Sequence, residues 1–399
     1  MSNKKHSLLK GKILYTIIII LIYLLCKNIP LYKIDIALYW GMKNDGSNLL
    51  LQTLGGDINQ CTLLALGITP YMIASIFVQI VISLRSSEYK KKTSPLKINK
   101  IIMQITLLIS IFMACVKVYD IQFVVSGRML ILAQMVAVIE MIAGAMLIIY
   151  LSSRNKKYGI GGQTAIIFIN IIDGILDTLS ANIGNRLVVP MIVSLVVMLV
   201  FIIMESSELR RGVQRISIHS IYADKNYMAI KLNPIGVMPA MFATAFFMIP
   251  QFLVKALAYI FYDNAFIVKL NENMILTRPL GVGVYISVLY ILTVFFSRIM
   301  LNPKEMTEQY LKSGDSLQDI HAGVDTKRYL SRVITTLGMT SATVMSICLG
   351  VPLFLQMKGI IDNSLVMLPS SIMMLTGIGS NLYTEMVAVK NLEGYKTFI

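Results

Sequence analysis

Ten apolar stretches, each about as long as a membrane-spanning helix, most strongly constrain how this 399-residue chain can fold. A helix needs about 20 mostly apolar residues to cross the hydrocarbon core of a bilayer. With 56% hydrophobic and 14% charged residues, the chain lacks the polar surface of a soluble globule, so we predict an all-α polytopic membrane protein with ten transmembrane helices. The stretches run approximately over residues 9–26, 66–84, 101–118, 129–151, 160–180, 187–204, 236–257, 281–300, 333–356 and 364–386.

The basic residues predict the orientation of these helices. Of the 36 Lys and Arg residues, 26 lie at the two ends of the chain or in the connections after the second, fourth, sixth and eighth stretches. Loops with an excess of Lys and Arg remain in the cytoplasm, so we expect both termini and these four loops on the cytoplasmic side. The net charge of +15 is therefore spread along a membrane face, which favours contact with lipids and argues against nucleic acid as a partner.

The predicted helices divide into two sets of five, over residues 1–180 and 181–399. An odd number of helices in each set gives the two halves opposite orientations, which is the inverted-repeat architecture of many transporters. We see no direct sequence identity between the halves, so this prediction rests on topology. A functional site is expected between the halves.

The second stretch begins with Leu-Gly-Ile-Thr-Pro-Tyr at residues 66–71, preceded by the polar segment 55–60. A membrane helix that begins with Gly and Pro lies beside non-helical backbone. Such backbone is tolerated only where protein or a water-filled cavity satisfies its N–H and C=O groups. The segment therefore predicts a cavity or pore.

Four motifs, in family order along nearly the whole chain, resemble those of the SecY family, the protein-conducting channels of Sec translocons. The resemblance implies a clamshell of two five-helix halves, an hourglass pore, a short plug helix, and a lateral gate between helices two and three and helices seven and eight. The motifs are residues 12–15 with 28–31, Gly-Gly at 55–56 with 65–71 and 74–76, Asn-Pro-Ile-Gly-Val-Met-Pro at 233–239 with 240–243, and Asn-Pro-Lys-Glu at 302–305 with 311–314 and 329–333.

A pore that passes a polypeptide but not ions needs a narrow apolar constriction, because a dewetted ring blocks hydrated ions. Ile68 and Met72, at positions i and i+4 of one helix face, suit that ring. Ordinary helix packing is the alternative interpretation of these two residues alone. The resemblance adds Met241, Thr164, Phe168 and Ser380 to the ring. The family has aliphatic residues where this chain has Thr164 and Ser380, so we expect a more polar constriction.

By the same resemblance, the segment of about residues 55–64 occupies the plug position. Glycines would let this segment break from helix geometry and swing, and its polar side chains suit a wet outer funnel. The plug residues singled out are Gly55, Gly56, Asp57, Asn59 and Gln60.

Two cytoplasmic loops, about residues 205–233 and 302–331, carry a further prediction. Asn302 is a good N-cap, Pro303 suits the first helical position, Glu305 completes a start resembling a capping box, and Gly314 suits the C′ position. We therefore predict a short helix over residues 303–313.

Basic side chains of these loops form a predicted docking face. They also satisfy the simpler interpretation that they enforce topology, but the family uses these loops to bind the ribosome or the SecA motor. Where the family has a Gly-Ile-Arg-Pro-Gly-like turn, this chain has Asp-Ile-His-Ala-Gly at 319–323, and His does not replace Arg chemically. The expected docking residues are Arg210, Arg211, Arg215, Lys304, Lys312, His321, Lys327 and Arg328.

This replacement, the short chain and the polar ring positions indicate a specialised paralogue of the bacterial plasma membrane. Accessory Sec systems contain such a SecY-type subunit, which works with its own SecA-type ATPase to export serine-rich glycosylated surface adhesins. The resemblance implies SecE-type and SecG-type or accessory small membrane subunits as further partners, and the preprotein as substrate. It implies no cofactor, metal or catalytic residue.

Two alternatives remain at this point. One is a housekeeping SecY channel. The other is a secondary transporter for a small solute, which would need ionisable groups near the membrane midplane, where only Glu140 qualifies. An intramembrane enzyme is a distant third, because His6, His219 and His321 all lie in predicted cytoplasmic segments.

Overall fold

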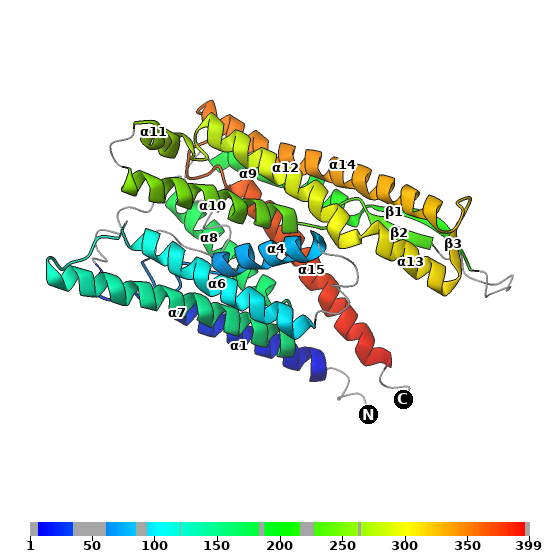
Figure 1. Cartoon of the computed structure of the whole chain (residues 1–399), viewed down its shortest axis with the longest axis horizontal. Helices are drawn as coiled ribbons and strands as arrows, with labels where there is room; N and C mark the ends of the chain where they lie inside the picture. The colour runs from blue at the N-terminus through cyan, green and yellow to red at the C-terminus, as the bar shows by residue number, and fades with distance from the viewer. Residues whose placement is uncertain are drawn as a thin grey trace.

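Long helices lying side by side make up most of the molecule (Figure 1). The computed structural model describes residues 7–34, 61–84, 94–119, 121–182, 187–215, 227–261 and 265–395. Both ends of the chain and a small sheet lie towards the same end of the bundle (Figure 1).

Each of the ten predicted stretches coincides with a helix. Two shorter helices, α11 (Ala265–Asn273) and α13 (Pro303–Ser313), lie in the connections. The long helices are α1 (Ser7–Lys27), α4 (Thr69–Leu84), α6 (Pro95–Val118), α7 (Arg128–Tyr158), α8 (Gln163–Ala181), α9 (Val188–Ser206), α10 (Met238–Ile260), α12 (Pro279–Leu301), α14 (Val324–Met357) and α15 (Leu368–Tyr395).

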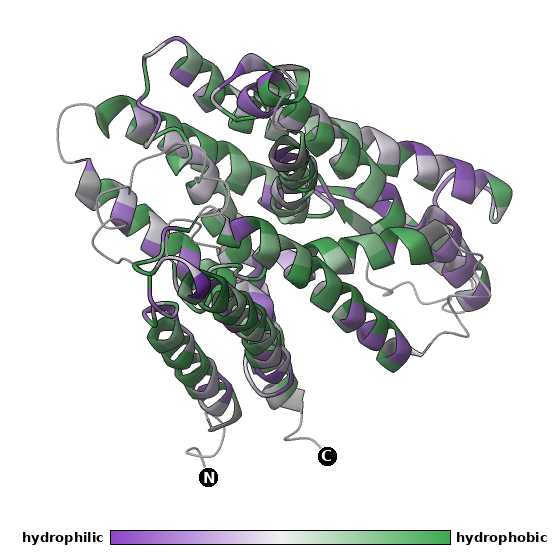
Figure 2. Cartoon of the chain, turned by 60° about the vertical axis from the view of Figure 1, so that its left-hand side comes forward, coloured by the Kyte–Doolittle hydropathy of each residue, from purple (hydrophilic) through white to green (hydrophobic). Residues whose placement is uncertain are grey.

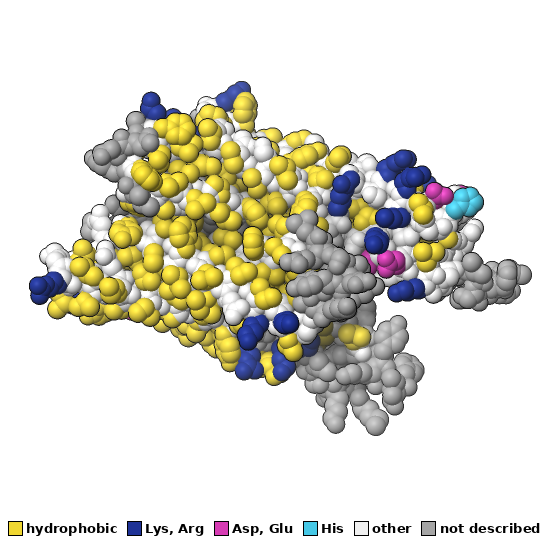
Figure 3. Space-filling model, in the orientation of Figure 1, with side chains coloured by type: hydrophobic (Ala, Val, Ile, Leu, Met, Phe, Trp, Pro, Cys, Tyr) yellow, Lys and Arg dark blue, Asp and Glu magenta, His cyan; other side chains and the backbone are white. Residues whose placement is uncertain are grey.

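Eight helices in the described part of the chain are long and apolar enough to cross a membrane. The apolar part of α4 is shorter, and α15 is not among the eight. Hydrophobic residues predominate along the long helices (Figure 2), and hydrophobic side chains cover most of the bundle on the face that Figure 3 shows. On α1, for example, Leu14 is 62% exposed and Leu25 is 71% exposed. Such a surface is suited to lipid, and the chain is a multi-pass membrane protein.

A three-stranded antiparallel sheet corrects the prediction of an all-α fold. It contains β1 (Glu208–Arg215), β2 (Tyr227–Lys231) and β3 (Asp315–Leu317), in the order β2-β1-β3. The short β3 pairs with β1 from the other loop, with Val213 opposite Leu317. This pairing is non-local and the strands are short, so apolar alternation along the sequence could not reveal it. The sheet joins the two loops that we predicted separately.

A small apolar cluster fixes the sheet to the helices. It consists of the buried side chains Met228, Ile230, Leu317, Leu330 and Leu337. Two of these residues belong to α14, which begins at Val324, well before the predicted start at residue 333. The hydropathy pattern missed this first part because it is charged, and helix outside the bilayer needs no apolar residues.

Packing between helices that are close in sequence and between helices that are distant builds the main core. The helix pairs α12–α14, α9–α15 and α4–α6 are in extensive contact, and α10 packs against α4, α6 and α12. The helix α8 packs against α15. The α4–α10 and α8–α15 contacts each join a helix from residues 1–180 to one from residues 181–399, and they position the candidate site.

Candidate functional site

The chain leads into α4 through a run of turns that is not helical. Gly67 has a φ of +57°, a left-handed conformation that favours glycine. The Leu63 N–H donates to the carbonyl of Ile29 (2.9 Å), and Lys117 Nζ donates to the carbonyl of Ala65 (3.0 Å). Protein groups therefore satisfy this irregular backbone, as its position beside a membrane helix requires.

The chain leads into α10 in a similar way. Gly236 has a φ of +68°, and Pro239 lies in the first turn of the helix. The starts of α4 and α10 share one pattern, because Gly-Ile-Thr-Pro-Tyr-Met at 67–72 corresponds to Gly-Val-Met-Pro-Ala-Met at 236–241. Our sequence reasoning missed this similarity, although a search for Gly-(Ile/Val)-X-Pro-X-Met would have found it. The two helices that begin with this shared pattern pack against each other.

Three of the predicted ring residues are buried in the main apolar core, which extends over most of the long helices. Ile68 is 2% exposed, Met72 is fully buried, and Met241 is 4% exposed. Ile68 immediately precedes α4, Met72 lies in its first turn, and Met241 lies in the first turn of α10. The starts of both helices therefore present apolar side chains to a common core.

The other three predicted ring residues belong to the α8–α15 contact. The Thr164 hydroxyl donates to the carbonyl of Gly161, so it supports the first turn of α8. Phe168 and Ser380 are half-buried. A Cβ placed at Gly379 would lie 3.7 Å from Cε2 of Phe168, so the Phe168 ring lies beside the α15 backbone next to Ser380. The polar groups of Thr164 and Ser380 thus lie on the side of the bundle built by α8 and α15.

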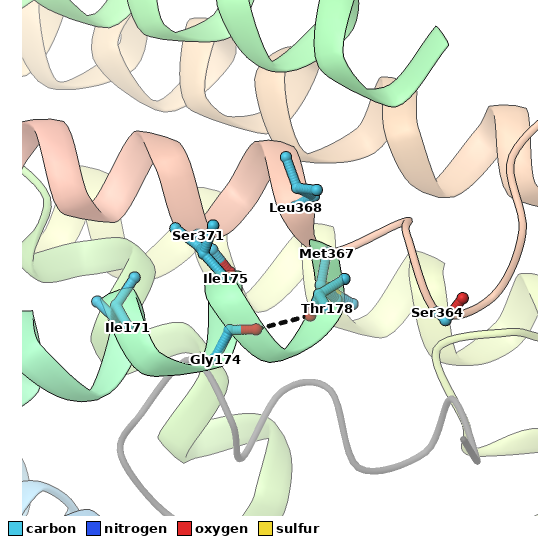
Figure 4. A pocket seen from close by; sticks show the side chains of 8 residues that line it. All are labelled: Ile171, Gly174, Ile175, Thr178, Ser364, Met367, Leu368 and Ser371. Atoms are coloured by element: carbon cyan, nitrogen blue, oxygen red, sulfur yellow. Dashed lines mark hydrogen bonds between the residues drawn. The ribbon is translucent and has the colours of Figure 1, made fainter. Parts of the chain in front are cut away.

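A small cavity of about 10 Å³ lies further along the α8–α15 contact (Figure 4). Figure 4 shows Ile171, Ile175 and Thr178 of α8 beside residues from the start of α15 and the connection before it. The hydroxyl of Ser364, which also lines this cavity, donates to Oδ1 of Asn182 (3.0 Å). The space is about that of one water molecule, so these two helices are closely packed along this contact.

The predicted plug residues Gly55, Gly56, Asp57, Asn59 and Gln60 lie outside the described residues. The end of the plug segment is described, and Leu64 is buried in the same apolar cluster as Ile68. The described backbone therefore leads from the plug position into the core near the predicted ring.

Glu140 of α7 is half-buried, and its Oε2 accepts a hydrogen bond from the backbone N–H of Tyr32 (3.0 Å). Lys27 forms a separate ion pair with Asp173 and also donates to Oδ1 of Asn170 (2.9 Å). Each of these polar groups contacts protein in a way that holds α1, or the connection after it, to a neighbouring helix. Among the described residues, no group of three or more His, Cys, Asp or Glu side chains could hold a metal ion.

The predicted docking face surrounds the sheet and the short helix α13. Arg210 lies over the ring of Tyr227 (4.8 Å to the centroid), and Arg211 Nε donates to the hydroxyl of Tyr329 (2.9 Å). This bond, which raises the pKa of Arg211, attaches β1 to the start of α14. The side chain of Arg215 lies outside the described residues. Arg210 and Arg211 are exposed, as are the remaining docking residues Lys304, Lys312, His321, Lys327 and Arg328.

The helix predicted over residues 303–313 is confirmed as α13. Gly314 ends it in the left-handed conformation, as expected. Asn302 occupies the N-cap position, as predicted, but its side chain accepts no hydrogen bond from the helix. Its amide donates to Oε2 of Glu305 (2.9 Å), and its φ of +24° turns the chain sharply between α12 and α13.

Irregular helix starts, long apolar helices and two joined loops together define a polytopic membrane protein. The family model described as SecY matches residues 62–383. The chain belongs to the SecY family, so the resemblance predicted from the four motifs is confirmed.

Relatives and solved structures match nearly the whole chain. Proteins named "Accessory Sec system protein translocase subunit SecY2" are 27% identical in Leuconostoc gelidum subsp. gasicomitatum, covering 98% of this chain and 97% of the relative, and 28% identical in Streptococcus agalactiae, covering 98% and 96%. A solved structure described as "The structure of a protein conducting channel" superimposes with a TM-score of 0.68 at 17% identity, covering 96% of this chain and 93% of the other. This superposition shows that the chain shares the fold of that channel.

Proposed function

We propose that this protein is the central channel subunit of an accessory Sec protein translocase, which passes unfolded preproteins across the bacterial plasma membrane. The observation that carries the proposal is the nearly full-length similarity to relatives named as accessory Sec SecY2 subunits. The channel itself is passive, so a SecA-type ATPase supplies the driving force. Serine-rich glycosylated surface adhesins are the proposed substrates.

The proposed topology has ten transmembrane helices in two inverted halves, residues 1–180 and 181–399, with both termini cytoplasmic. The repeated Gly-(Ile/Val)-X-Pro-X-Met starts of α4 and α10 support it, because inverted repeats place broken helices in corresponding positions of the two halves. The α15 helix would cross the membrane although it carries Ser, Thr and Asn, since it is packed between α8 and α9.

The proposed constriction lies between α4 and α10 on one side and α8 and α15 on the other. Ile68, Met72 and Met241 supply its apolar wall, where dewetting would stop hydrated ions. Thr164, Phe168 and Ser380 supply the opposite wall. This wall carries two hydroxyl groups, so it would be easier to wet than an all-aliphatic ring. The plug segment of about residues 55–64 would close the constriction from outside.

The proposed docking face for the SecA-type ATPase comprises the exposed basic residues of the two loops. The β1–β3 pairing supports this role, because it makes one rigid surface from loops that are distant in sequence. SecE-type and SecG-type or accessory small subunits would pack against the apolar outside of the bundle.

Reconstitution tests the proposed function. The purified protein, its small membrane subunits and its cognate SecA-type ATPase would be placed in proteoliposomes with two competing substrates, a glycosylated serine-rich preprotein and an ordinary secretory preprotein. We expect transport of the glycosylated preprotein. Efficient transport of the ordinary one alone would identify a housekeeping channel, and uptake of a small solute with transport of neither preprotein would identify a transporter.

Crosslinking tests the proposed constriction. A cysteine introduced by Ile68→Cys or Met241→Cys should crosslink to a preprotein stalled during translocation. The matched control is Glu140→Cys, because Glu140 lies on α7 and contacts the chain after α1. Equal crosslinking at all three positions, or at Glu140 alone, would contradict the proposed pore.

A further inference from the structure

An open groove of about 640 Å³ lies where the C-terminal end of α12 meets the N-terminal part of α14. Four cationic side chains line it, Arg298 from α12 and Lys327, Arg328 and Arg332 from α14. Figure 3 shows Lys and Arg side chains gathered over this end of the molecule, beside the broad hydrophobic band. Among the described residues, no acidic side chain lines the groove, so its positive charge is not neutralised from within.

Local geometry gathers these cations on one face. The lining positions of α14 recur at helical spacing, which places them along one side of the helix. Arg298 Nε donates to the Thr335 hydroxyl (2.9 Å), which holds the guanidinium of α12 against α14. Arg328 approaches Asp325 only at 4.0 Å, and both of these side chains are largely exposed. The guanidinium groups therefore keep free N–H donors, which suit the oxygen atoms of a phosphate.

The length of α14 places the groove at the membrane surface. Its 34 residues span about 51 Å, whereas the hydrocarbon core is about 30 Å thick. If Met357 marks one edge of the hydrocarbon, the other edge falls near Leu337, about 20 residues earlier. The α14 cations then lie just outside that edge, at the depth of lipid headgroups.

The apolar surface beside the groove continues into the hydrocarbon region. Met339 lines the groove and is 46% exposed. Further along the same two helices, Ile291 is 65% exposed, Ile347 is 57% exposed and Phe354 is 55% exposed. A cationic groove that opens onto exposed apolar helix matches a molecule with an anionic head and an apolar tail. A soluble partner protein could reach the cations but not this apolar surface.

We propose that the groove binds the phosphate group of an anionic phospholipid from the cytoplasmic leaflet, with its acyl chains along α12 and α14. The proposal rests on the proposed membrane orientation but not on preprotein transport. Inorganic phosphate has the same chemistry as the phosphate of a lipid headgroup, so the experiment must distinguish these two ligands. Lys327 and Arg328 also belong to the proposed docking face, so we assign the phosphate to Arg298 and Arg332, which lie nearer the membrane. Docking of the motor ATPase in the groove itself is the competing interpretation.

The test uses the full-length protein in detergent micelles with photoreactive phosphatidylglycerol or phosphatidylcholine, each carrying the reactive group on an acyl chain. Crosslinked peptides are identified by mass spectrometry. With the unmodified protein we expect phosphatidylglycerol to label α12 and α14 at least about fivefold more than phosphatidylcholine, since one basic contact with an anionic surface contributes about that factor. Equal labelling by the two lipids would overturn the proposal, and this comparison requires no variant.

The Arg298→Gln/Arg332→Gln double variant should lower phosphatidylglycerol labelling of α12 and α14 at least about fivefold, by the same factor per basic contact. The matched control is Lys97→Gln/Lys100→Gln, which removes two charges at the start of α6 and should leave this labelling unchanged. An Arg298→Lys/Arg332→Lys variant keeps the charge and should retain part of the labelling, which separates lost binding from misfolding. Undiminished labelling of the Gln variant would overturn the proposal.

Two competitors complete the test. Millimolar inorganic phosphate should not displace the lipid, and displacement would identify a free-anion site instead. The purified motor ATPase should leave the labelling in place. The groove would be assigned to motor docking if two results were found together. The motor would have to block lipid labelling of the unmodified protein completely, and the Arg298→Gln/Arg332→Gln variant would have to be labelled as strongly as the unmodified protein. Preprotein transport is measured separately, so a failure of the channel proposal is distinguishable from a failure of this one.

Discussion

A methyl group added at Gly144, in α7, should disturb the turns that lead into α4. A Cβ placed there would lie 1.9 Å from the carbonyl oxygen of Leu63 and 2.8 Å from its carbonyl carbon. Contacts of this kind shorter than 3.0 Å essentially do not occur, so the Leu63 carbonyl must move by the difference between 1.9 and 3.0 Å, 1.1 Å. The perturbation we predict is therefore Gly144→Ala, which pushes the turns before α4 away from α7.

The energetic cost follows from three contributions. Overpacking of this size costs about 1–3 kcal/mol. Moving the Leu63 carbonyl also weakens the neighbouring bond from the Leu63 N–H to Ile29, which contributes about 1 kcal/mol. Alanine favours the helix over glycine by about 1 kcal/mol, which offsets that much of the cost. We expect Gly144→Ala to lower the free energy of unfolding by about 1–3 kcal/mol, the net of these values.

Denaturation by SDS in mixed micelles measures this free energy, and amide hydrogen exchange locates the change. The matched control is Gly283→Ala in α12, because a Cβ at Gly283 meets no described atom within 4 Å and the substitution should be neutral or slightly stabilising. Exchange should become faster at residues 61–68 in Gly144→Ala alone. If both variants were equally stable and residues 61–68 exchanged as in the unmodified protein, the close approach of Leu63 to α7 would be refuted.

Three further substitutions test other parts of the structure. Gly236→Ala should lower the free energy of unfolding by about 1–2 kcal/mol through backbone strain, because the φ of Gly236 is +68°. Steric overlap does not contribute, since the atoms nearest to the new Cβ are 3.7 Å away. SDS titration with Gly283→Ala as the control measures the change. The buried Ser341 hydroxyl donates to Asn233 Oδ1 (2.9 Å), and Asn233→Ala, which removes this bond, should lower the free energy of unfolding by about 1–3 kcal/mol. Adding Ser341→Ala to this variant should lower it little further, because the bond is already lost. If the costs of the two substitutions were fully additive, the contact would be contradicted. His321→Arg should change the affinity for the motor ATPase in a pull-down. It should leave the free energy of unfolding unchanged, because His321 is exposed. A loss of stability would instead show that the His321 side chain has a structural role.

The positions of the long helices could be predicted because each depends on its own apolar residues. A stretch of about 20 such residues must leave water wherever it lies in the chain, so neighbouring segments hardly alter the outcome. The short helix α13 was equally predictable from Pro303 at its start and Gly314 at its end. The start of α14 was not, because a charged helical turn outside the bilayer has no hydropathy signal.

The sheet and the contacts of the candidate site could not be predicted in the same way. The β1–β3 pairing joins Val213 to Leu317, and nothing in either short segment specifies a partner so far away in the chain. Similarly, residues 67–72 and 236–241 each indicate an irregular helix start, but only the packed chain shows that α4 and α10 contact each other and that Met72 and Met241 are both buried in the main core. Side chains from separate helices meet according to how whole helices pack.

The sequence alone therefore determines the membrane class of this protein, the positions of its helices, the family motifs and the irregular backbone at Gly67. These features are local, since hydropathy, backbone sterics and capping act over a few residues. The tertiary structure decides that the two cytoplasmic loops form one surface, that α4 and α10 pack against each other, and that Arg298 joins the cations of α14 in a groove. Those features depend on contacts between distant segments, which only the packed chain brings together.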